Sequence, residues 1–240
     1  MIKRAGLLLL VVVLLLTVAA PVLVYARGEI TIRASSTEVE FPGKIVFKLS
    51  AQSEVNITEV RLHYVVEQRH IAEVTSEAYV EIMPAMAVDA EWTWDMRKTG
   101  GLPPGAVLSY WWSVKDARGS MVATPPAKLQ FEDKRYSWRS WEQGPVTLYW
   151  YQGGEPFARE LMASAQQALV RLERETGARL EQPVRLYIYA STRDLQGAMV
   201  FPQEWTGGAA YTAQGIMVIG IPPALLDWGK RAITHELTHL

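Results

Sequence analysis

The alternation of apolar and polar residues between Glu29 and Asp133 constrains the fold of this chain more than any other feature of its sequence. Apolar side chains recur at every second position in about seven short segments, as at Val60, Leu62 and Tyr64. Because successive side chains of a β-strand point to opposite faces, this period predicts strands with one buried face. Glycine and proline residues separate the segments at intervals of about 8 to 15 residues, which is typical of a β-sandwich.

The absence of cysteine narrows both the type of sandwich and the chemistry. It excludes disulfide scaffolds, thiolate zinc sites and a cysteine nucleophile. Among sandwiches of the immunoglobulin and fibronectin-III type, it favours the fibronectin-like ones. We therefore predict an all-β sandwich domain over residues 27–135.

The hydrophobic pattern changes after Arg135. Residues 136–143 are interpreted as a linker, and 144–240 as part of an α+β domain that ends on a helix. Helical spacing of apolar residues and strand-like runs alternate there. The predicted elements are strand 146–151, helix 155–176, strand 184–189, a short helix capped by Ser191 or Thr192, a hairpin at 209–219 and a final helix from about Asp227.

The N-terminal 26 residues have the pattern of a secretory signal peptide. Lys3 and Arg4 precede an unbroken apolar run, and Val24-Tyr25-Ala26 offers small residues at the positions that a signal peptidase reads. The alternative is an uncleaved membrane anchor, because residues 5–26 are just long enough to cross a bilayer. Either interpretation predicts a protein that works outside the cytoplasm.

The charge composition gives no indication of a nucleic-acid partner. The chain has 24 basic and 25 acidic residues and a net charge of −1. A nucleic-acid-binding surface requires an excess of lysine and arginine that this balance does not supply.

The C-terminal sequence RAITHELTHL places two histidines four residues apart on the final predicted helix. Residues at this spacing lie one above the other, so His235 and His239 can bind one tetrahedral zinc ion through their imidazole nitrogens. Glu236 lies beside them, where its carboxylate can act as general base on a metal-bound water without being a ligand. The apolar residues of the helix are expected on the opposite, buried face: Ile233, Leu237 and Leu240. Two histidines that share a helix by chance are the alternative interpretation.

Other segments accompany the HELTH motif, among them WTGGAAYTAQGIMVIGIPP at 205–223 and the stretch 149–199. Together with THELTHL they resemble the start of a peptidase-MA-like gluzincin, a family of bacterial zinc metallopeptidases. Segments 102–126 and 131–153 resemble the N-terminal region of exported members. The resemblance implies His235 and His239 as zinc ligands, Glu236 as the base, and a peptide or protein as substrate. It also implies that a strand within 207–221 lines the substrate cleft.

The third zinc ligand of a gluzincin is a glutamate on a following helix, and no residue of this sequence follows Leu240. The nearest upstream carboxylates, Glu204 and Asp227, are interpreted as a loop residue and a helix N-cap. We therefore expect a fragment, truncated just after HExxH, that binds zinc weakly and is inactive. A third histidine after a glycine would instead indicate a metzincin, and the sequence does not separate these subclasses.

A second class of function is also compatible with the sequence. The chain would then be an exported β-sandwich binding or adhesion module, and its α+β region a non-catalytic scaffold. The zinc content of the purified protein distinguishes this class from a zinc-dependent peptidase.

Overall fold

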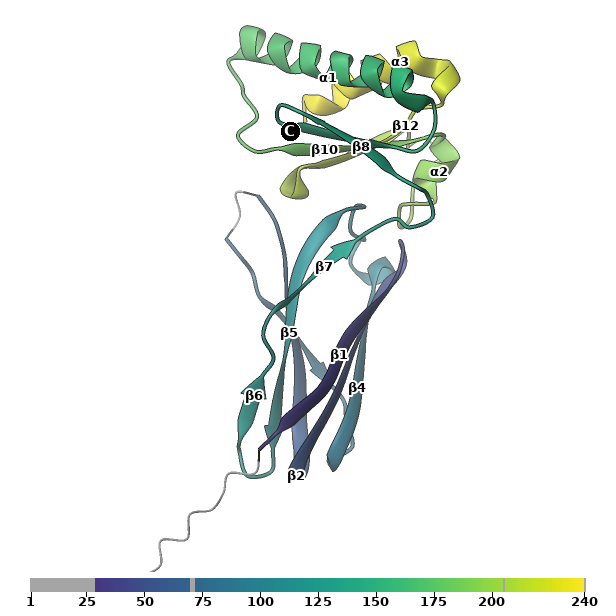
Figure 1. Cartoon of the computed structure of the whole chain (residues 1–240). Helices are drawn as coiled ribbons and strands as arrows, with labels where there is room; N and C mark the ends of the chain where they lie inside the picture. The colour runs from purple at the N-terminus through teal and green to yellow at the C-terminus, as the bar shows by residue number, and fades with distance from the viewer. Residues whose placement is uncertain (1–28, 70–71, 205, 240) are drawn as a thin grey trace, which may run out of the picture.

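The computed structural model of the chain describes residues 29–69, 72–204 and 206–239. The predicted signal or anchor segment, 1–26, lies outside the described residues. Within them, a β-rich region is followed by a mixed α+β region, in the order that the sequence predicts (Figure 1). No helix of the described part of the chain is long and apolar enough to cross a membrane.

The β-rich region contains seven strands in the described residues. They are β1 (Thr31–Glu40), β2 (Lys44–Val66), β3 (Ser76–Val80), β4 (Ala85–Asp95), β5 (Ala106–Asp116), β6 (Met121–Ala123) and β7 (Ala127–Phe131), with the 3-10 helix η1 (Met96–Lys98) after β4. The sequence predicts separate strands at 45–49 and 60–66, but both belong to β2. Residues 44–52 of β2 pair with β1 and β4, and residues 57–66 pair with β5 and β3. A register shift between them lets one long strand take part in two layers.

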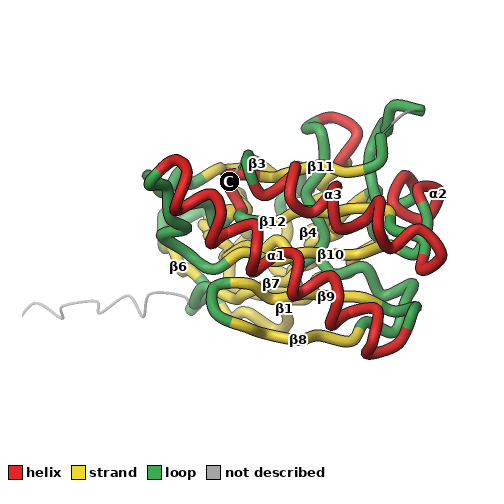
Figure 2. Tube along the Cα trace, turned by 90° about the horizontal axis from the view of Figure 1, so that it is seen from above, coloured by secondary structure: helices red, strands yellow, loops and turns green. Residues whose placement is uncertain are grey.

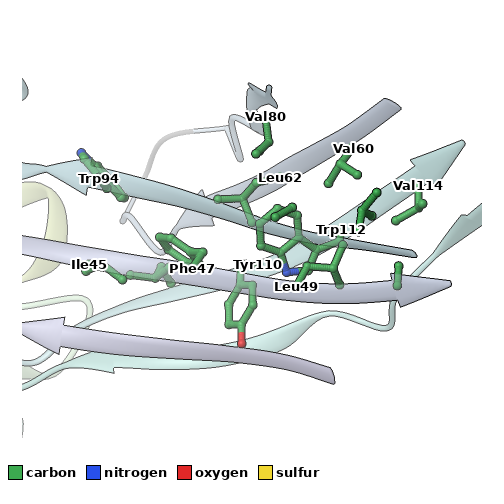
Figure 3. Close-up of a cluster of buried hydrophobic side chains, with 14 of the residues drawn as sticks. Ile45, Phe47, Leu49, Val60, Leu62, Val80, Trp94, Tyr110, Trp112 and Val114 are labelled. Carbon is green, nitrogen blue, oxygen red and sulfur yellow. The ribbon is translucent and has the colours of Figure 1, made fainter. Parts of the chain in front are cut away.

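The two layers enclose a single core. The ring of Phe47, in the first half of β2, meets that of Tyr110 in β5 edge-on, with 5.2 Å between centroids. The indole Nε1 of the fully buried Trp112 donates a hydrogen bond of 3.2 Å to Ser35 Oγ in β1. Ser35 lies in β1, which does not pair with β5, and Phe47 lies in the half of β2 that pairs with β1 and β4, so the two layers pack face to face. Figure 3 shows core residues from both layers: Ile45, Phe47, Leu49, Val60, Leu62, Val80, Trp94, Tyr110, Trp112 and Val114.

The α+β region is built on a five-stranded sheet in the order β11-β12-β10-β9-β8. Strands β9, β10 and β12 are parallel, and the edge strands β8 and β11 are antiparallel to their neighbours. The elements are β8 (Arg139–Gln143), β9 (Val146–Trp150), α1 (Gly154–Thr176), β10 (Val184–Tyr189), α2 (Thr192–Gln196), β11 (Gly208–Tyr211), η2 (Thr212–Gln214), β12 (Ile216–Gly220), η3 (Pro223–Leu225) and α3 (Leu226–Leu237). Helices α1 and α3 cover one face of the sheet (Figure 2).

The helices form where the sequence predicts them. Helix α1 buries Phe157, Leu161 and Ala165 against the sheet at helical spacing, and its carboxyl end stops at Gly177. Gly177 adopts the left-handed conformation, and its N–H donates to Glu173 O at 2.8 Å. The Ser191 hydroxyl caps α2 by accepting from the Asp194 N–H.

Residues 136–143, which the sequence predicts as a linker, differ from that prediction. Arg139–Gln143 form β8 and pair with β9 after a tight turn at Gly144, whose φ is 57°. Trp138 packs edge-on against Tyr189, with 5.1 Å between ring centroids. Strand β8 has only five residues, and Trp141 is the one that is partly buried. Such a short alternation of apolar and polar residues does not identify a strand in the sequence.

The other face of the sheet meets the β-rich region (Figure 1). The fully buried Asp133 carboxylate accepts from Arg135 Nε at 2.8 Å and Nη2 at 2.7 Å, and from the Tyr189 hydroxyl at 2.9 Å. Arg135 also donates from Nη1 to Gly197 O at 2.7 Å. Burial and the nearby Asp133 carboxylate raise the pKa of the Tyr189 hydroxyl, so it stays a hydrogen-bond donor. Asp133 therefore ties the end of the β-rich region to strand β10.

Candidate active site

Helix α3 carries His235 and Glu236, and His239 lies in the turn that follows its end. It begins at Leu226 rather than at Asp227, and Asp227 lies in its first turn without a side-chain capping bond. The helix dipole favours a carboxylate in the first turn, so Asp227 can stabilise the amino end of α3 although it is not the N-cap. The helix is predicted to run to Leu240, but it ends at Leu237. Thr238 N–H and His239 N–H donate to His235 O and Glu236 O, and these i to i−3 bonds tighten the last turn.

The apolar face of α3 is buried as predicted at Ile233 and Leu237, whereas Leu240 lies outside the described residues. Ile233 and Leu237 are 0% and 2% exposed and belong to the core beneath α1 and α3. A side chain at Gly229 would collide with Ile221, so glycine lets α3 approach the segment after β12 closely. This packing turns the opposite face of the helix outward.

His235 and His239 lie side by side on that outward face. Both are exposed, and their ring centroids are 5.1 Å apart with the ring planes at 81°. With Zn–N bonds of about 2.0–2.1 Å and tetrahedral angles, two imidazoles on one zinc ion have centroids about 5 Å apart. The spacing of the two rings therefore fits a shared zinc ion.

Glu236 is partly buried and reaches the edge strand β11. A Cβ atom placed on Gly208, the first residue of β11, would lie 2.9 Å from Glu236 Oε1. The carboxylate thus lies almost against the backbone of the edge strand, and glycine leaves room for it.

A cleft of about 550 Å³ opens between α3 and the start of β11. His235, Glu236, Trp228 and Arg231 line one side of it, and Gly207 and Gly208 line the other. His239 is not one of its lining residues. Trp228 and Arg231 are not among the site residues predicted from the sequence. They precede His235 by seven and four residues, and this spacing predicts that they lie on the same face of the helix.

His235 and His239 are the candidate zinc ligands among the described residues, and Glu236 is the candidate base. Among the described residues no group of three or more histidine, cysteine, aspartate or glutamate side chains lies together in the manner of a metal site. In particular, Glu204 and Asp227 do not complete the pair of histidines. A zinc ion would therefore be held by His235 and His239, and further ligands would come from elsewhere.

Two histidines four residues apart with a glutamate after the first are the motif of HExxH metallopeptidases. Residues 164–240 match the family model of the Peptidase MA superfamily. This match confirms the resemblance for the C-terminal segment, which contains α2, the β11–β12 hairpin and α3.

Two solved structures to which the chain is similar are distant ones. OgpA from Akkermansia muciniphila, crystallised with an O-glycopeptide substrate, has a TM-score of 0.33 and 9% identity, and the match covers 45% of this chain and 30% of OgpA. The β-1,3-glucan binding domain of carbohydrate-binding module family 56 has a TM-score of 0.24 and 17% identity, covering 42% and 98%. These scores are too low to support an inference about function. A search of curated protein sequences finds no significant match.

Proposed function

We propose that this protein hydrolyses peptide bonds with the help of a zinc ion bound by His235 and His239. The observation that carries the proposal is the Glu236 carboxylate against Gly208 of the edge strand β11, in the segment whose two histidine rings have a spacing that fits one zinc ion. The Peptidase MA match over residues 164–240 supports the same class of reaction.

The zinc ion, when bound, would supply a Lewis acid that polarises the carbonyl group of the scissile bond. Two histidine ligands fit the spacing of the rings but leave the ligand set incomplete. The resemblance to gluzincins assigns the third ligand to a glutamate that follows His239. The proposed hydrolysis of peptide bonds depends on that third ligand. The proposed binding of zinc by His235 and His239 does not depend on it.

Glu236 acts as the general base. Its carboxylate accepts a proton from the attacking water and returns it to the amine that leaves. The substrate lies along β11, because this strand pairs with β12 on one side and is an edge of the sheet on the other. An extended peptide can pair with such an edge through its backbone, which places the scissile carbonyl beside Glu236.

Zinc binding tests the ligand assignment directly. Alanine at His235 or at His239 is expected to weaken zinc affinity at least about a hundredfold, because loss of a ligand costs more than loss of a group that orients one. Isothermal titration of the full chain with zinc measures this. His63→Ala is the control, since His63 lies in β2, stacked on Trp111 and bonded to Ser113. Affinity that stays the same in both ligand variants would show that these residues do not bind the ion.

We also propose, from its sequence, that the N-terminal region is fibronectin-III-like and spans 27–135, and that 144–240 belong to the peptidase domain. The two packed layers around one core support a sandwich. Because β8 pairs with β9, we assign residues 139–143 to the peptidase domain as well.

Export is proposed from residues 1–26. Expression in a bacterial host is expected to yield, outside the cytoplasm, a protein that begins at Arg27, because Val24-Tyr25-Ala26 precedes the predicted cleavage point. Mass spectrometry of the intact protein measures the N-terminus. A membrane-bound product that retains Met1 would indicate the anchor instead, and an unprocessed cytoplasmic product would contradict export.

A further inference from the structure

Arg231 is the one arginine or lysine among the described residues that line the cleft. It lies four residues before His235 on α3 and is exposed. No carboxylate of the described residues lies within ion-pair distance of it. The next residue toward the N-terminus, Lys230, differs, because its ammonium group is 2.5 Å from Glu160 Oε2 on α1. Of these two adjacent cations on α3, Lys230 is therefore paired with a carboxylate of α1, and Arg231 faces the cleft.

We propose that Arg231 binds a carboxylate of the substrate close to the scissile bond, so that the enzyme prefers acidic peptides. The inference rests on the proposed peptidase function, whose site it shares. A guanidinium group presents parallel N–H donors that match the two oxygens of a carboxylate. An arginine without an acidic partner in a substrate cleft is therefore suited to recognise an acidic side chain or a C-terminal carboxylate.

The distance along the helix between Arg231 and Glu236 defines which residue of the substrate Arg231 contacts. Arg231 precedes Glu236 by five residues, which rise about 7.5 Å in an α-helix, and one residue of an extended peptide spans about 3.3 Å. If the peptide runs along β11 beside Glu236, Arg231 lies about two residues from the scissile bond. The recognised carboxylate thus belongs to a residue near the cut.

Trp228 strengthens the recognition of an anion at this place. It lies three residues before Arg231, is 38% exposed and lines the same cleft. Its ring passes Gly207, where an added Cβ would be 3.6 Å from the indole. An aromatic wall next to the guanidinium excludes part of the water and so reduces the screening of the charge pair. The carboxylates nearest in sequence are Asp227 and Glu236, and neither forms an ion pair with Arg231.

Peptide binding tests the inference without requiring turnover. The full chain with Glu236→Gln, in zinc-containing buffer, is titrated into fluorescein-labelled peptides, and anisotropy gives the affinities. One peptide has a central glutamate and an amidated C-terminus, and a second has glutamine in its place. A third has the glutamine and a free C-terminal carboxylate. We expect about five- to tenfold tighter binding of whichever acidic peptide presents the recognised carboxylate. The first and third peptides separate the side chain from the C-terminus as its source.

Substitutions of Arg231 show whether this residue causes the preference. Arg231→Gln is expected to abolish it, and Arg231→Glu to reverse it in favour of a peptide with a central lysine. Arg159→Gln is the matched control, because Arg159 is also an exposed helical arginine without an ion pair in the described residues but lies near β8, at the opposite sheet edge.

The outcomes separate this inference from the proposed function. Equal binding of acidic and neutral peptides, an unchanged preference in Arg231→Gln, or no binding of any peptide would each overturn the role of Arg231. Failure of the peptidase proposal is detected separately, by the absence of zinc binding and of peptide cleavage. If the protein binds zinc and cleaves peptides but binds acidic and neutral peptides equally, the proposed function stands and the role of Arg231 is wrong.

Discussion

In a protein that supplies the third zinc ligand, glutamine in place of Glu236 is expected to lower the rate of peptide hydrolysis by about 10²–10⁴-fold and to leave zinc affinity unchanged. The amide keeps the size and the position of the side chain beside β11, but it cannot accept the proton of the attacking water. Glu236 is not a ligand in this proposal, so the ion stays bound to His235 and His239. Cleavage of a quenched fluorescent peptide by the zinc-loaded full protein gives the rate, and titration calorimetry gives the affinity.

The control for Glu236→Gln is a glutamate on another helix. Glu155 is exposed in the first turn of α1, near strand β8, and Glu155→Gln removes the same charge at the far edge of the sheet. It is expected to retain the wild-type rate. Hydrolysis that persists undiminished in Glu236→Gln would rule out this residue as the base. A loss of zinc along with activity would instead identify Glu236 as a ligand.

Alanine in place of Asp133 is expected to lower the free energy of unfolding by about 2–4 kcal/mol. The substitution leaves the fully buried Tyr189 hydroxyl without its acceptor and removes the two contacts of the Arg135 guanidinium. Arg135 keeps a side chain that is 37% exposed, so solvent compensates part of its loss, which places the effect below that of a fully buried pair. Urea denaturation followed by tryptophan fluorescence measures the change.

The chain contains a close internal control for Asp133. Asp95 accepts the N–H, Nε and Nη2 hydrogens of Arg97 in the way that Asp133 accepts those of Arg135. Arg97 lowers the pKa of Asp95 to about 2, yet this pair lies on the surface with Arg97 68% exposed. Asp95→Ala is therefore expected to cost much less stability than Asp133→Ala. Equal losses in the two variants would show that burial and the bond to Tyr189 contribute nothing.

The elements with a strong local pattern were predictable from sequence. Helix α1 follows from the spacing of Phe157, Leu161 and Ala165 and from Gly177 at its end. The β11–β12 hairpin follows from Gln214-Gly215, and the structure places Gly215 in the left-handed conformation that its turn requires. Elements whose pattern is short or interrupted were not predictable. Examples are β8, which was predicted as a linker, and the continuity of β2 across 52–57.

The candidate site divides in the same way. The spacing in the sequence predicts neighbouring rings for His235 and His239 with Glu236 beside them, because four residues make about one helical turn, and it predicts that Ile233 and Leu237 are buried on the other side. Only the tertiary structure decided what faces those side chains, because segments far apart in sequence meet only when the chain packs. Packing brings Gly208 of the edge strand against Glu236, and α3 presents Trp228 and Arg231 to the same cleft. Local periodicity assigns a residue to a face of its own element, but the neighbours of that face depend on how α3 packs against the sheet.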